Sequence, residues 1–172
     1  MALTLADQYY IKALDGYDYD LEEVVENLNY ALSYDQDHAG ANYLMGKLYM
    51  EQFQKFDLAK EYLEASMAYD PENLNTCESL SWLLIRTRKF KEALKLITYA
   101  LGLDGVIRPD FIRLQALVHE LQKDYYRAKD LLNLAIEESY DSSYISFLES
   151  EISRVKKKIK RMPKIKYHYV EE

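Results

Sequence analysis

Residues 90–101 read FKEALKLITYAL, and three other stretches of the chain share their pattern. The other three are LEEVVENLNYAL (21–32), FDLAKEYLEASM (56–67) and YYRAKDLLNLAI (125–136). The fourth position of each stretch holds a small or β-branched residue: Val24, Ala59, Ala93 and Ala128. The eleventh holds a second small residue: Ala31, Ser66, Ala100 and Ala135. Successive copies lie 34 or 35 residues apart in both registers, which indicates a four-fold internal repeat.

Each repeat is predicted to be two helices joined by a short turn. The four stretches have apolar residues at helical spacing, and further amphipathic stretches precede the last three, at residues 43–49, 80–85 and 111–118. Asp70 before Pro71 predicts a helix N-cap, and Pro109 predicts the start of a later helix. Gly105 predicts that a helix has ended just before it. Five glycines and three prolines in 172 residues argue against a loop-rich all-β fold and against a disordered chain.

At these residues the chain resembles the tetratricopeptide repeat family. In the second repeat Gly46 is the small residue inside the first helix, Tyr49 follows three positions later, and Pro71 stands at the exit of the second helix. The resemblance covers about residues 3–140. It implies an all-α fold, an α-solenoid of about four tetratricopeptide-like helical hairpins in residues 1–140. Such hairpins stack because one alone cannot bury its apolar face, and their first helices line a concave surface.

The repeat pattern stops after residue 140. Residues 141–162 predict a C-terminal capping helix that begins at Asp141 and that Pro163 should stop. Its apolar stripe is predicted at Tyr144, Phe147 or Leu148, Ile152, Val155, Ile159 and Met162. Residues 163–172 are predicted to be an extended basic and aromatic tail, because apolar and polar residues alternate there as in a strand.

Helical phase predicts which residues of the first helices face the concave surface. The reference points are Gly46 and Ser81, taken as helix–helix contacts. The predicted partner-binding residues are Tyr43, Lys47, Met50, Glu78, Trp82, Arg86, Ile112 and His119, and the same phase adds Ile85, Ala116 and Glu120. Aromatic residues among charged ones are typical of a protein-binding surface, although Trp82 could equally be wedged between repeats. The sequence therefore predicts a non-catalytic protein–protein interaction module that binds a peptide or helix in this groove.

Charge is unevenly distributed along a chain whose net charge is −7. Residues 1–40 contain nine acids and one base, whereas residues 152–170 contain eight bases and no acid. The basic end is either a solvated face or a contact for an acidic protein, another copy's acidic start included; an overall pI near 5.1 disfavours nucleic acid. The candidate contact residues are Lys156, Lys157, Lys158, Lys160 and Arg161. The alternative function is therefore a structural assembly or chaperone-like subunit that associates through its two charged ends.

The sequence contains no motif for a cofactor, a metal ion or catalysis. His38, His119 and His168 are dispersed, and His38 is expected in a solvated turn. Cys77 is the only cysteine and is expected to be a packing residue in a reducing compartment, which predicts a cytoplasmic location. No apolar run approaches the roughly 18 residues of a membrane span, and the start lacks the pattern of a signal peptide.

Overall fold

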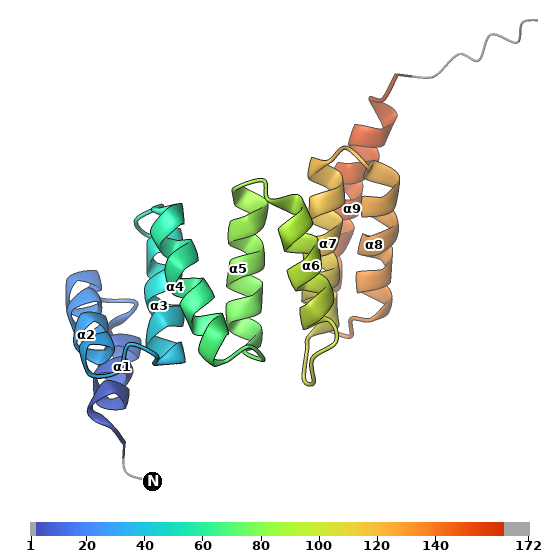
Figure 1. The fold of residues 1–172 in the computed structure, drawn as a ribbon. Helices are drawn as coiled ribbons and strands as arrows, with labels where there is room; N and C mark the ends of the chain where they lie inside the picture. The colour runs from blue at the N-terminus through green and yellow to red at the C-terminus, as the bar shows by residue number, and fades with distance from the viewer. Residues whose placement is uncertain (1–2, 164–172) are drawn as a thin grey trace, which may run out of the picture. The chain divides into compact units, whose positions relative to one another are not determined.

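The computed structural model describes residues 3–163, and every regular element within that range is an α-helix (Figure 1). The predicted all-α fold is therefore confirmed. Of the predicted tail, only Pro163 belongs to the described residues. The helices of this range are α1 (Leu5–Gly16), α2 (Leu21–Tyr34), α3 (Ala39–Glu51), α4 (Phe56–Tyr69), α5 (Leu74–Arg86), α6 (Phe90–Ala100), α7 (Arg108–Leu121), α8 (Tyr125–Glu137) and α9 (Ser142–Lys160).

The helices form two compact units, the first ending at Val106 and the second beginning at Ile107. In the first unit the hairpins are α1–α2, α3–α4 and α5–α6, and α2 contacts α3 while α4 contacts α5. First helices of neighbouring hairpins also touch, α1 with α3 and α3 with α5. In the second unit α7 pairs with α8, and α9 packs against α8. The predicted domain limits, 1–140 and 141–162, stay a prediction.

The small residues that recur in the sequence lie in the seams between helices. All eight recurring positions are completely buried: Val24, Ala31, Ala59, Ser66, Ala93, Ala100, Ala128 and Ala135. Gly46 shows how close the backbones come, because a Cβ atom added there would lie 2.7 Å from Leu63 Cγ and 3.1 Å from the Ala59 carbonyl oxygen. Ala59, which belongs to the first register, therefore lies where the backbones of α3 and α4 come close together.

The turns inside three hairpins share one backbone feature. Gln54, Arg88 and Lys123 have φ angles of 52°, 59° and 68°, in the left-handed region that non-glycine residues seldom adopt. Their spacing, 34 and then 35 residues, equals the spacing of the buried small residues. The same turn thus recurs with the period of the sequence. Gly105 also has a positive φ, of 73°. However, α6 ends at Ala100, whereas the sequence predicted that this helix continues until just before Gly105.

Side chains cap several helices, and one predicted cap is wrong. Asn73 rather than Asp70 caps α5, because the side-chain oxygen Oδ1 of Asn73 accepts the Thr76 N–H at 3.1 Å. Asp70 instead ends α4, so the turn is three residues longer than predicted. Asp141 caps α9 as predicted, since its carboxylate accepts backbone N–H groups at 2.8 and 3.0 Å.

The C-terminal helix α9 buries one apolar stripe, as the sequence predicted. The completely or nearly buried members are Leu148, Ile152 and Val155. Phe147 is 44% exposed, so the structure decides between the two predicted residues in favour of Leu148. The helix ends at Lys160, and Met162 beyond it is exposed.

Candidate interaction surface

Five residues predicted for the concave surface lie on two neighbouring first helices of the first unit. They are Tyr43 and Lys47 of α3 and Glu78, Trp82 and Arg86 of α5, here called the α3–α5 surface. The two helices contact each other directly. Arg86 is exposed, and the other four side chains are half-buried. The structure therefore leaves part of each side chain accessible.

Two residues predicted for this surface are buried instead, and the prediction is corrected for them. Met50 is 5% exposed and Ile112 is 2% exposed. The further residues of the same phase, Ile85, Ala116 and Glu120, are also buried. The prediction used one reference contact in each helix, Gly46 or Ser81, whereas α3 and α5 each pack against several helices, so the buried arc is wider than predicted. These residues are left out of the proposed surface.

Both cations of the α3–α5 surface lie over aromatic rings. The Lys47 Nζ atom is 5.3 Å from the centre of the Tyr17 ring, and the Arg86 Cζ atom is 4.9 Å from the centre of the Phe56 ring. Cations within about 6 Å of a ring are attracted to its face. Each long side chain therefore has a favourable position over an aromatic ring.

Two tyrosines of the first hairpin border this surface, and sequence reasoning missed them. The Tyr17 hydroxyl donates to Glu51 Oε2 at 3.3 Å, and burial together with the Glu51 charge raises the pKa of Tyr17. Tyr10 lies over Gly40, where an added Cβ would come within 2.8 Å of the Tyr10 ring. The two tyrosines are seven residues apart, which places them on one face of a helix. That spacing is the signal that could have revealed them.

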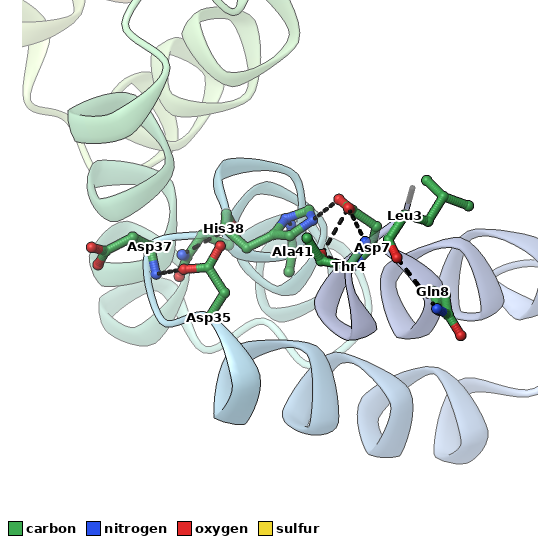
Figure 2. Close-up of polar contacts among 9 residues, drawn as sticks. Leu3, Thr4, Asp7, Gln8, Asp35, Asp37, His38 and Ala41 are labelled. Atoms are coloured by element: carbon green, nitrogen blue, oxygen red, sulfur yellow. Dashed lines mark hydrogen bonds and ion pairs between the residues drawn. The ribbon is translucent and has the colours of Figure 1, made fainter. Parts of the chain in front are cut away.

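His38 lies in the predicted turn before α3, but its ring is bound rather than solvated (Figure 2). Its Nδ1 accepts the backbone N–H of Ala41 at 3.0 Å and so caps α3. Its Nε2 lies 3.2 Å from Asp7 Oδ1 and donates to it, because Nδ1 is used as an acceptor. The Tyr10 ring packs against the imidazole with centres 5.0 Å apart. One histidine thus caps α3 and joins α1 to it.

We expect the Asp7 carboxylate to make the stability of the first unit depend on pH. Hydrogen bonds from Thr4, followed by the hydrogen bond from His38, lower the pKa of Asp7. Because the folded pKa lies below the unfolded one, the stabilisation is complete at neutral pH and disappears as the pH falls below about 4. Asp7→Asn should therefore lower the urea midpoint more at pH 7 than near pH 3. An equal deficit at both pH values would contradict this assignment.

The remaining predicted surface residue, His119, belongs to the second unit. It lies half-buried near the end of α7, with Nδ1 3.5 Å from Asp124 Oδ2. The Asp124 backbone N–H also donates to the His119 carbonyl oxygen at 2.8 Å. His119 therefore contributes to the turn between α7 and α8.

The basic end of the chain is divided between two roles. Arg154 and Lys158 of α9 both bind Glu120 of α7, whose side chain is 2% exposed; the Lys158 Nζ atom is 2.6 Å from Glu120 Oε1. Lys158 was predicted to be available to a partner, and this is corrected, because it is already paired inside the second unit. Four other predicted cations are exposed and form no ion pair with the described residues: Lys156, Lys157, Lys160 and Arg161.

Cys77 and possible metal ligands are the remaining candidate groups in residues 3–163. Cys77 is buried as predicted, and burial raises the pKa of its thiol to about 11, which keeps it protonated at neutral pH. Within residues 3–163, no three His, Cys, Asp or Glu side chains gather closely enough to bind a metal ion. No helix in that range combines the length and apolar character that crossing a membrane requires.

Comparison with known proteins supports the fold. No protein-family model and no curated protein matches the chain. Among solved structures, that of Pseudomonas aeruginosa PilF is 17% identical, with a TM-score of 0.75 over 89% of this chain and 69% of that chain. MamA from Desulfovibrio magneticus RS-1 is 11% identical, with a TM-score of 0.70 over 94% of both chains. Yeast Tom70 is 24% identical, with a TM-score of 0.59 over 81% of this chain and 29% of that chain. These are tetratricopeptide-repeat proteins, so the chain has a tetratricopeptide-like helical-repeat fold.

Proposed function

We propose that this chain, with its tetratricopeptide-like fold, is a non-catalytic protein–protein interaction module whose α3–α5 surface binds a peptide or helix of another protein. Structures of this fold support a protein-interaction role in general. The observation that carries the proposal is the placement of Lys47 over Tyr17 and of Arg86 over Phe56. Side chains ordered in advance lose less conformational entropy when a partner binds.

The chemistry of the α3–α5 surface suits a peptide with both apolar and charged side chains. Tyr43 and Trp82 offer large ring surfaces, which supply much of the binding energy in protein interfaces. Lys47 and Arg86 are positive and Glu78 is negative, and such mixed charges fix the register and direction of a bound peptide. Affinity would thus come from the rings and orientation from the charges.

Trp82→Ala should weaken partner binding at least tenfold, because truncating a central aromatic residue at an interface has effects of about this size or larger. Tyr140→Ala is the matched control, since that ring is 99% exposed and lies in the other unit. Partners captured from native lysate with the wild-type chain would be identified by mass spectrometry, purified and titrated against all three proteins. Unchanged affinity for the Trp82 variant, together with a loss of stability, would show that the indole only packs between helices.

A second candidate function, self-association through the charged ends, is favoured by a separate observation. Lys156, Lys157, Lys160 and Arg161 lack an ion pair within residues 3–163, whereas the neighbouring Arg154 and Lys158 are paired. The first 40 residues carry a charge of −8, equal and opposite to the charge of residues 152–170. The cytoplasmic location and the chaperone-like role stay predictions from the sequence.

A further inference from the structure

The first hairpin carries a stack of exposed tyrosines. The ring of Tyr9 on α1 lies against the rings of Tyr30 and Tyr34 on α2, with centres 5.1 and 5.8 Å apart. Tyr30 is 45% exposed and Tyr34 is 56% exposed, so the described residues leave much of the stack uncovered. The extensive helix contacts of α1 and α2 are with each other and with α3. These three residues are called the tyrosine edge.

The tyrosine edge has acidic surroundings. Glu23 and Glu26 precede Tyr30 by seven and four residues, so they lie along the same side of α2. Both are exposed, and neither forms an ion pair with the part of the chain that the structure describes. Tyr9 already accepts one cation, because the Lys12 Nζ atom lies 5.0 Å from its ring centre. Carboxylates beside tyrosine faces form a surface suited to lysine and arginine.

The last turns of α9 have the complementary chemistry. Three exposed cations lie there: Lys157, Lys160 and Arg161. The second and third follow the first by three and four residues, so all three share one side of the helix end. Their spacing gives a compact group of positive charges on a rigid element. A helix end of this kind can present several cations to one acidic surface at once.

We infer that the tyrosine edge of one copy of the chain binds the basic end of α9 of a second copy. This inference rests on the second candidate function, self-association, and names the two surfaces that make the contact. After such a contact the pair keeps one unused tyrosine edge, on the copy that gave its basic end, and one unused basic end, on the copy that gave its edge. The association is therefore head-to-tail, and more copies can add to it.

Charge reversal tests the inference in the full chain. The edge variant is Glu23→Lys with Glu26→Lys, and the end variant is Lys157→Glu with Lys160→Glu. Lys91→Glu with Lys95→Glu, on exposed positions of α6, is the control for the net charge of the end variant. Far-UV circular dichroism checks that every variant keeps its helices, and sedimentation velocity measures association at about 0.05 M and 0.5 M salt, because salt screens exposed charges.

We expect the wild type and the control to associate at low salt and dissociate at high salt. Each variant alone should sediment as a monomer, whereas an equimolar mixture should associate, because the edge variant keeps a native basic end and the end variant keeps a native edge. Tyr34→Ser should weaken association several-fold with all charges kept.

Two results would overturn the inference in distinguishable ways. A wild type that stays monomeric at low salt would overturn both the inference and self-association. If such a monomer binds a lysine-rich peptide, the tyrosine edge would be assigned to another protein, and both would still be overturned. Association that persists in the reversed variants, or that the mixture fails to restore, would leave self-association standing and place it on other surfaces.

Discussion

Replacing Gly46 with leucine should lower the free energy of unfolding of the first unit by about 1–3 kcal/mol, the usual cost of overpacking a close-packed site. The first added atom would meet Leu63 Cγ at 2.7 Å and the Ala59 carbonyl oxygen at 3.1 Å. Both neighbours are completely buried, so neither can move into solvent. Leucine favours a helix over glycine by roughly 1 kcal/mol, so a net loss can come only from packing.

Trp82 provides the measurement for this variant. It is the only tryptophan in the chain and lies in the same unit as Gly46, so its fluorescence during urea unfolding reports on that unit. Gly102→Leu is the matched control, because a Cβ added at Gly102 meets its nearest atom, the Tyr99 carbonyl oxygen, at an ordinary 3.4 Å. Equal urea midpoints for the two variants would show that the α3–α4 seam is not as tight as the structure indicates.

The sequence predicted the fold well because the repeated residues are packing residues. Ala93 and Ala100 recur as Ala128 and Ala135, and all four are completely buried, so the period records the seam inside each hairpin. The same period could not reveal the division after Val106, because the pattern continues across it without interruption. A repeat that reports packing within hairpins contains little information on where compact units divide.

The candidate surface was predictable only in part, because side-chain exposure depends on every neighbouring helix. Of the residues that helical phase assigned to the surface, Tyr43 and Trp82 are half-buried, whereas the packing of α3 buries Met50. Lys157 and Lys158 are adjacent in the sequence, yet only Lys158 reaches Glu120. That carboxylate comes from a different helix, so no local pattern could separate the two lysines.

Removing both cations that bind Glu120 should destabilise the second unit more than removing Glu120 itself. In the double variant Arg154→Met with Lys158→Met, a carboxylate that is 2% exposed would lose its two partners. An unpaired charge at a buried position costs about 3–5 kcal/mol. In Glu120→Leu the two cations are 40% exposed and can be hydrated, and Arg154 still pairs with Glu151 Oε2 at 2.5 Å. The loss should therefore be smaller.

The triple variant, which combines Glu120→Leu with both methionines, separates the burial of charge from the loss of contacts. We expect it to recover most of the stability that the double variant loses, because no charge then remains buried without a partner. Urea unfolding followed by far-UV circular dichroism measures stability, and amide hydrogen exchange in α9 shows whether this helix is released first. If the triple variant is less stable than the double variant, Glu120 contributes through packing, and the ion pairs are not what holds α9 against α7.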